Sequence, residues 1–151
     1  MNSVDRSLFL DRFLNYVKYD TQSSEESDTY PSTMKQLELS KKLVEELDKL
    51  GLQDVELTEH GYVFATLPAN IDFDVPVIGL IAHVDTSPDV SGKNVQTVIH
   101  KNYQGGDIVL SKAEDQIIEF DMNPALKDCI GHDIITTDGS TLLGADNKAG
   151  I

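Results

Sequence analysis

The sequence of 151 residues has one cysteine, Cys129, and no tryptophan. A single cysteine excludes a disulfide within the chain, which fits a reducing compartment. Basic residues are also scarce: 12 lysines and arginines stand against 26 acidic residues, and the net charge is −14. The only arginines are Arg6 and Arg12. Because proteins bind phosphate backbones with clustered lysine and arginine, we expect no nucleic-acid partner.

Long apolar runs are also absent from the sequence. No stretch approaches the roughly 20 apolar residues that a transmembrane helix needs. Charged residues interrupt any apolar signal core in the first twenty positions, namely Asp5, Arg6, Asp11, Arg12 and Lys18. We therefore expect a cytoplasmic protein with no membrane partner. With 40% hydrophobic residues, the chain is long enough to form one domain with a hydrophobic core.

Two segments have the periodicity of amphipathic helices. The first spans about residues 4–19, with apolar residues three and four apart at Leu10, Phe13, Leu14 and Val17. In the second, Thr33 and Gln36 have the spacing of a capping box. A leucine stripe follows at Leu39, Leu43, Leu47 and Leu50, and Gly51 is expected to end this helix.

Short apolar and β-branched runs predict strands. They span residues 55–58, 62–67, 75–82, 108–110, 117–118 and 134–137, with a turn at His60-Gly61. The run 75–82 is apolar apart from Pro76 and Gly79, as expected of a buried strand. The sequence therefore predicts an α/β fold in which helices flank a mixed sheet and functional side chains follow the strand ends.

The motif Ala82-His83-Val84-Asp85-Thr86 follows the buried strand. Residues two apart in an extended chain point to the same side, so we expect His83 and Asp85 to project together. An imidazole in this position can bind a metal while the carboxylate fixes its orientation and tautomer. An ordinary strand-end histidine remains the alternative.

A second motif, Gly144-Ala145-Asp146-Asn147-Lys148-Ala149-Gly150, follows the strand 134–137. Its small residues let the backbone approach a ligand closely. Asp146 is a candidate metal ligand, and its alternative role is that of a helix N-cap. The other histidines, His60, His100 and His132, are expected in turns, loops or at the surface, and we assign no metal to them.

Several blocks of this sequence, in one order, resemble the M20 family of di-zinc metallopeptidases, and within it the tripeptide aminopeptidases. The blocks are Asp20-Thr21-Gln22-Ser23, Ala65-Thr66-Leu67-Pro68-Ala69-Asn70, Ala82-His83-Val84-Asp85-Thr86-Ser87-Pro88-Asp89, Ser91-Gly92-Lys93-Asn94-Val95, Asn102-Tyr103-Gln104-Gly105-Gly106-Asp107-Ile108 and Thr136-Thr137-Asp138-Gly139-Ser140-Thr141-Leu142-Leu143-Gly144-Ala145-Asp146. The resemblance implies that residues 1–151 are the N-terminal portion of a zinc-exopeptidase-like catalytic domain.

The resemblance also implies roles for three residues. His83 would bind one zinc ion, Asp85 would orient that histidine and support catalysis, and Asp146 would bridge the two zinc ions of a complete site. The substrate would be a tripeptide that loses its N-terminal residue through attack of a metal-activated water. Family members usually have a second aspartate where Asn147 stands.

Other parts of the family's active site have no counterpart in these 151 residues. They are a Glu-Glu pair that supplies the general base and a zinc ligand, a later acidic ligand and a later histidine. We therefore expect the isolated 151 residues to be inactive and marginally stable unless they assemble with themselves or with the missing part.

Two alternatives remain open. One is another M20 hydrolase, such as a dipeptidase, a carboxypeptidase or a deacylase, although the block Ser91-Gly92-Lys93-Asn94 argues against it. The other, for the isolated 151 residues, is a non-catalytic module that binds divalent metal or takes part in assembly.

Overall fold

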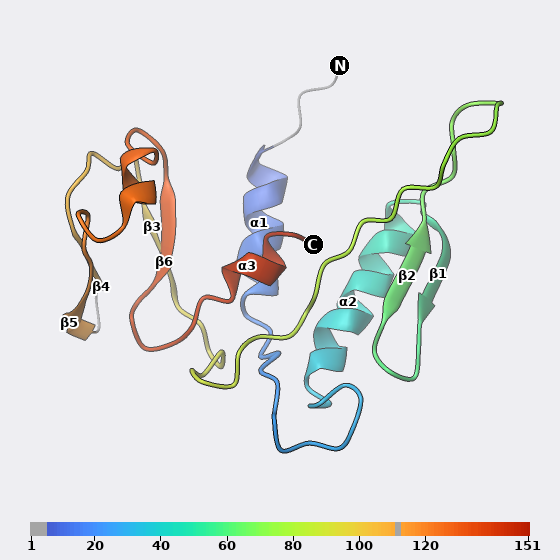
Figure 1. The fold of residues 1–151 in the computed structure, drawn as a ribbon, viewed down its shortest axis with the longest axis horizontal. Coiled ribbons are helices and arrows are strands. Elements are labelled where there is room, and N and C mark those ends of the chain that lie inside the picture. The colour runs from blue at the N-terminus through green and yellow to red at the C-terminus, as the bar shows by residue number, and fades with distance from the viewer. Residues whose placement is uncertain (1–5, 111–112) are drawn as a thin grey trace. The chain divides into compact units, whose positions relative to one another are not determined.

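The computed structural model describes residues 6–110 and 113–151. The chain divides into one unit of Met1–Lys18 with Val90–Gly144 and a second of Tyr19–Asp89 with Ala145–Ile151. The elements are, in chain order, α1 (Arg6–Tyr16), α2 (Gln36–Lys49), β1 (Gln53–Leu57), β2 (Val63–Thr66), β3 (Thr97–His100), β4 (Ile108–Leu110), β5 (Ala113–Ile118), a 3-10 helix (Pro124–Lys127), β6 (Ile134–Thr137) and α3 (Ala145–Lys148). Figure 1 labels all of them except the 3-10 helix.

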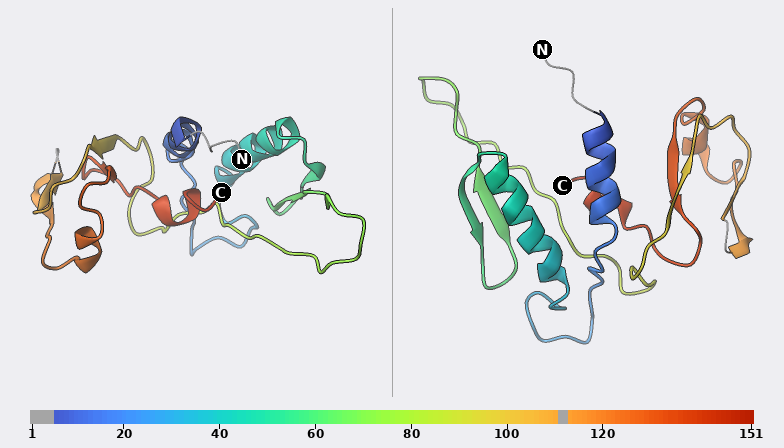
Figure 2. Two further views of the ribbon diagram at one scale, coloured as in Figure 1. Left: turned by 90° about the horizontal axis from the view of Figure 1, so that it is seen from above. Right: turned by 180° about the vertical axis from the view of Figure 1, so that it is seen from behind.

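In the second unit, α2 packs against the antiparallel pair β1–β2. Figures 1 and 2 show the helix lying alongside both strands. Leu39 and Leu43 are buried on the helix, which confirms the start of the predicted stripe. Leu50 lies beyond the last helical residue and is exposed, so its predicted place on the stripe is wrong. The predicted helix and both predicted strands are present, with ends shifted by a few residues.

The two ends of α2 differ in how well the sequence predicts them. Gly51 has φ +80° and its N–H donates to the Asp48 carbonyl at 2.9 Å, which confirms the predicted glycine stop. The predicted capping box is wrong, because the helix begins after Lys35 without a side-chain cap. The Thr33 hydroxyl instead donates to the Gln22 carbonyl at 2.7 Å and accepts from the Gln36 side chain at 3.2 Å. Thr33 therefore joins the helix start to the loop before it.

The turn between β1 and β2 forms at His60-Gly61, as predicted. Gly61 has φ +84° and donates to the Thr58 carbonyl at 3.0 Å. A Cβ at Gly61 would lie 3.1 Å from a Leu37 methyl group, so both its backbone angle and its surroundings favour glycine. His60 is exposed at this turn.

The first unit contains α1 and two antiparallel strand pairs, β3–β6 and β4–β5. A small core of Tyr103, Ile108 and Leu126 packs against residues of β4, β5 and β6, namely Leu110, Ile118 and Ile134. The predicted strands 108–110 and 134–137 are confirmed, and 117–118 is the end of the longer β5. His100 lies on β3, with Nε2 3.0 Å from the Thr136 hydroxyl, rather than in a loop. Of the helix predicted at 4–19, residues 4 and 5 lie outside the described residues, and α1 ends at Tyr16.

The largest correction concerns residues 75–82, which were predicted to form a buried strand. They form no strand and no ladder, and Val77 and Ile81 are 98% and 99% exposed. Figure 1 draws this part of the chain, after β2, as a loop. The described residues form three two-stranded antiparallel sheets rather than one mixed sheet. The physical reason is pairing: a buried strand needs hydrogen-bonding neighbours, and no described strand lies beside this run.

The segment before α2 is tied to the helix by an ion pair. The Asp20 carboxylate lies 2.9 Å from Lys35 Nζ and accepts from the Gln22 N–H at 3.2 Å. Partial burial acts to raise the pKa of Asp20, but the hydrogen bonds from Lys35 and Gln22 and the nearby positive charges hold that pKa below its usual value. The folded state therefore favours the charged form of this carboxylate.

None of the helices among residues 6–110 and 113–151 has the length and apolar character needed to cross a membrane.

We expect the exposed run 75–82 to cause self-association, because contiguous exposed apolar surface drives proteins together. Replacing Val77 and Ile81 with lysine should reduce association in sedimentation velocity. The melting temperature should change by no more than about 2 °C, since surface substitutions usually change stability by less than about 0.5 kcal/mol. Met122→Lys, at another exposed apolar residue, is the control and should leave association unchanged. Equal association of the double variant and the unmodified protein would contradict this interpretation.

We expect Asp20→Asn to lower the free energy of unfolding at pH 7 by up to about 1 kcal/mol, since the ion pair is partly exposed. A carboxylate whose folded pKa is lowered stabilises the fold above its unfolded pKa of about 4, and loses that effect as the pH falls through the folded value. The difference between the two proteins should therefore shrink below about pH 4 in urea titrations. Glu38→Gln, which breaks the more exposed pair with Lys41, should change stability less.

Candidate metal centre

His83 and Asp85 lie at the end of the extended run 75–82. His83 Nδ1 is 3.0 Å from Asp85 Oδ1, so the two side chains meet as their spacing predicts. With the proton on Nδ1, the ring donates to the carboxylate and Nε2 keeps a free electron pair. A carboxylate–imidazole pair of this kind orients histidines that bind metals.

Asp146 approaches the other side of the same imidazole. Its Oδ2 lies 3.9 Å from His83 Nε2, although 63 residues separate them in the sequence. Asp146 is in the first turn of α3, not at the predicted N-cap position, and its side chain is 84% exposed. His83 therefore lies between two carboxylates, one at each ring nitrogen.

The distance from His83 to Asp146 can be compared with the size of a zinc site. Zinc bonds to histidine nitrogen and carboxylate oxygen are about 2.0–2.2 Å long, so two ligands of one ion lie at most about 4.3 Å apart. The observed 3.9 Å meets this limit. The described residues contain no group of three or more histidine, cysteine or acidic side chains arranged to hold a metal. The described residues therefore hold at most this pair, whose 3.9 Å separation lies within the span of two ligands of one zinc ion.

Asn147, next to Asp146, is a buried residue that the sequence did not single out for a structural role. It is 2% exposed, and its Nδ2 donates to the carbonyls of Val84 at 3.0 Å and Asp85 at 2.8 Å. These hydrogen bonds join α3 directly to the backbone that carries His83 and Asp85. The contact uses an N–H donor, so it needs no negative charge at position 147.

Lys148 is also buried, at 2% exposure, and Nζ donates to the Tyr19 carbonyl at 2.7 Å. Burial lowers the pKa of Lys148 to about 8, although Asp20 acts to raise it. Lys148 thus joins α3 to the segment that begins at Tyr19.

The segment after Tyr19 pairs with the backbone next to the histidine motif. Thr86 N–H donates to the Thr21 carbonyl at 3.0 Å, and Ser23 N–H donates to the Thr86 carbonyl at 2.9 Å. These two hydrogen bonds form an isolated parallel β-bridge between Gln22 and Thr86. The backbone just after the run 75–82 is thus paired, although the run itself is not. The block Asp20-Thr21-Gln22-Ser23 therefore also holds the backbone next to His83 and Asp85.

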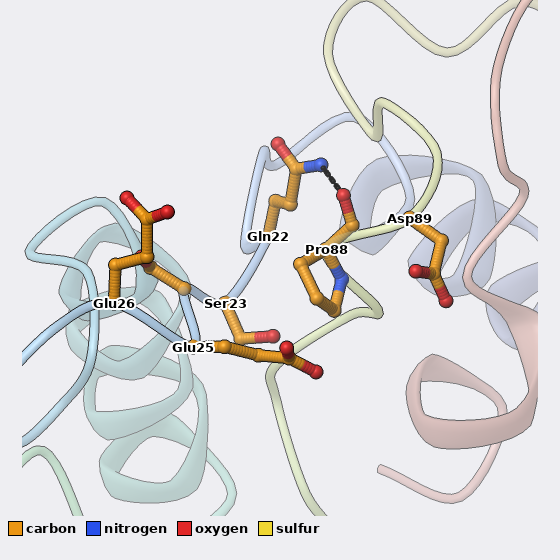
Figure 3. Close-up of a pocket in the computed structure, with 7 residues that line it drawn as sticks. Gln22, Ser23, Glu25, Glu26, Pro88 and Asp89 are labelled. Carbon is orange, nitrogen blue, oxygen red and sulfur yellow. Dashed lines mark hydrogen bonds between the residues drawn. The ribbon is translucent and has the colours of Figure 1, made fainter.

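A shallow pocket of about 390 Å³ lies beside this bridge. Its lining residues are Gln22, Ser23, Ser24, Glu25, Glu26, Pro88 and Asp89. Figure 3 shows the Gln22 amide bonded to the Pro88 carbonyl, at 2.8 Å, and the three carboxylates pointing in different directions. Because the carboxylates do not converge, we assign no ion to this pocket.

The small residues around Asp146 are the sequence signal that could have revealed the buried Asn147 and Lys148. A Cβ at Gly150 would lie 3.3 Å from the Asn147 carbonyl and 3.8 Å from the Ala82 methyl group. A Cβ at Gly150 would therefore be tight against α3 and in ordinary contact with Ala82 at the start of the histidine motif. Such close packing is the condition under which polar neighbours become buried.

Comparison with known proteins gives a consistent picture. No protein-family model matches the chain. The chain is 58% identical over 142 residues to "Peptidase T" of Clostridium botulinum strain Loch Maree, and 57% identical over 142 residues to "Peptidase T" of Halothermothrix orenii strain H 168. Each match covers 94% of this chain and 35% of the relative. The chain is thus similar to proteins named Peptidase T and spans about a third of the length of the curated relatives that it matches.

Proposed function

We propose that this sequence acts as the N-terminal part of a zinc-dependent aminopeptidase that releases the N-terminal residue from tripeptides. The observation that carries the proposal is His83, which lies 3.0 Å from one carboxylate and 3.9 Å from another at its two ring nitrogens. The similarity to proteins named Peptidase T supports the same conclusion and favours a peptide substrate.

Each of the three residues has a distinct role in this proposal. His83 would hold zinc, and Asp85 would accept a hydrogen bond from Nδ1–H and so keep the electron pair on Nε2. Asp146, with a largely exposed carboxylate, would be the second ligand from this sequence. Zinc supplies Lewis-acid chemistry when bound, because it acidifies water and polarises a peptide carbonyl.

His83 and Asp146 leave about two positions of a four-coordinate zinc ion to other ligands. The M20 resemblance assigns these ligands, and the glutamate that takes the proton from water, to segments without a counterpart in this sequence. We therefore propose that the isolated 151 residues bind metal without hydrolysing peptides. The second candidate function, which concerns these residues alone, is thus that of a non-catalytic metal-binding module.

We expect isothermal titration to detect zinc binding that depends on His83 and Asp146. His83→Ala and Asp146→Ala each remove one direct ligand, so each should weaken the zinc affinity by more than the roughly 10–100-fold typical of second-shell changes. His132→Ala, which removes a histidine from the other unit, is the matched control and should bind zinc normally. Equal zinc binding by all four proteins would rule out the proposed centre.

We expect substrate preference to separate the proposed activity from other M20 activities. A chimera in which this sequence replaces the matching segment of the Halothermothrix orenii relative should hydrolyse tripeptides faster than dipeptides or N-acyl amino acids. Asp85→Ala in that chimera should lower kcat/KM for the tripeptide by roughly 10–100-fold, since Asp85 acts through His83.

The chimera needs two controls. Circular dichroism checks that the variant is folded, and Asp72→Ala, at an exposed residue outside the site, should retain full activity. A preference for N-acyl amino acids or dipeptides would overturn the tripeptide assignment in favour of another M20 hydrolase.

A further inference from the structure

We propose that the Asn147 carboxamide is a positioning residue that fixes the backbone of Val84 and Asp85 and thereby sets the distance between His83 and Asp146. The inference rests on the proposed zinc centre. It assigns to Asn147 a task that is neither metal binding nor proton transfer.

The two hydrogen bonds from Asn147 have the geometry that this task requires. Both hydrogens of Nδ2 are used, at 3.0 Å to the Val84 carbonyl and 2.8 Å to the Asp85 carbonyl. The two acceptors belong to the consecutive residues Val84 and Asp85. The contact therefore restrains this part of the backbone in orientation as well as in position. The side chain is buried, which shields both hydrogen bonds from competing water.

Asn147 also has the right neighbour for this role. Asp146 precedes it directly on α3, so any shift of Asn147 relative to Val84 and Asp85 moves the Asp146 carboxylate relative to His83. Among the described residues, the Asp146 carboxylate contacts His83, at 3.9 Å, and no closer partner of this carboxylate is seen. The position of Asp146 therefore depends on its neighbours, and Asn147 is the neighbour bonded to the histidine motif.

The next residue of the motif, Thr86, is held independently of Asn147. Thr86 exchanges backbone hydrogen bonds with Thr21 and Ser23, which fixes its place without α3. Losing the Asn147 contact would therefore remove the direct bonds between α3 and the motif, while the Thr86 pairing and the Lys148 bond to Tyr19 remain. This asymmetry predicts a change in metal geometry without general unfolding.

The choice of side chain agrees with this role. Both acceptors are carbonyl oxygens, so the contact needs a donor with two hydrogens, which a carboxamide provides and an ionised carboxylate does not. The M20 resemblance leads one to expect an aspartate at this position. Asparagine makes these two hydrogen bonds without adding a charge beside Asp85 and Asp146.

The test compares zinc affinity with stability. We expect Asn147→Ala to weaken zinc binding roughly 10-fold or more by isothermal titration, the range reported for second-shell partners of metal ligands. Asn123→Ala is the matched control, because Asn123 Nδ2 donates to the Glu119 carbonyl at 2.8 Å in the other unit. It should leave the zinc affinity unchanged. Thermal melts of both variants establish that they are folded at the titration temperature.

A second readout reports on His83 directly. In ¹⁵N spectra of the metal-free protein, the His83 imidazole, assigned with His83→Ala, should be protonated on Nδ1 when Asp85 holds it. Asn147→Ala should mix the two tautomers, because the Asp85 backbone is no longer fixed. A purely structural role for Asn147 would lower the melting temperature and leave this signature intact.

The outcomes separate this inference from the proposed function. Absence of His83-dependent zinc binding in the unmodified protein would overturn the zinc centre and the inference with it. Normal zinc binding by a folded Asn147→Ala variant would overturn the inference alone. If that variant does not fold, proton exchange of the Asn147 carboxamide is measured in the unmodified protein instead. It should be slower than that of the exposed Asn70 carboxamide, and equal rates would overturn the inference.

Discussion

The hydrogen bonds that hold the backbone at residues 84–86 are the constraint on which the rest of the site depends. Thr86 is paired with Thr21 and Ser23, and the Val84 and Asp85 carbonyls are bonded to Asn147. Neither partner is close in sequence, so the loop that carries His83 obtains its order from distant segments rather than from a sheet of its own. The approach of the Asp146 carboxylate to the imidazole depends on these two attachments.

The same constraint explains how His83 and Asp146 come close together beside an unpaired apolar run. Residues 75–82 have the composition of a buried strand, yet their backbone has no ladder and their side chains are exposed. The order of the His83 motif therefore cannot come from that run. It comes from the short bridge at Thr86 and from α3, two polar attachments that replace the missing sheet.

Local signals in the sequence predicted local structure well. Gly51 ends α2 because only a residue that tolerates positive φ fits there, and this requirement is readable from the glycine after a leucine stripe. The i, i+2 spacing of His83 and Asp85 predicted their contact because extended geometry alone produces it. The strands 108–110 and 134–137 were likewise visible as short apolar and β-branched runs.

Features that depend on distant partners were not predictable in this way. The prediction of a mixed sheet was wrong. Strand pairing depends on which segments of the chain meet, and the composition of a segment does not indicate its partner. The capping box was wrong because Thr33 bonds to Gln22, a residue before the helix. The burial of Asn147 and Lys148 depends on carbonyls more than 60 residues earlier in the chain. Asp146 was a candidate ligand from its own motif, its bridging role came from the family resemblance, and its closeness to His83 came from the fold.

The free-energy contributions of the Asn147 side chain indicate that an amide at this position serves to orient the backbone more than to stabilise the fold. Two donated hydrogen bonds contribute about 1–3 kcal/mol together, at roughly 0.5–1.5 kcal/mol each. The Oδ1 atom of the same amide is buried and accepts no hydrogen bond from the described residues, which costs about 1–3 kcal/mol. These contributions offset each other, so the residue adds little net stability. Its two hydrogen bonds still fix the direction of the Val84–Asp85 peptide, and a well-packed apolar residue could not do so.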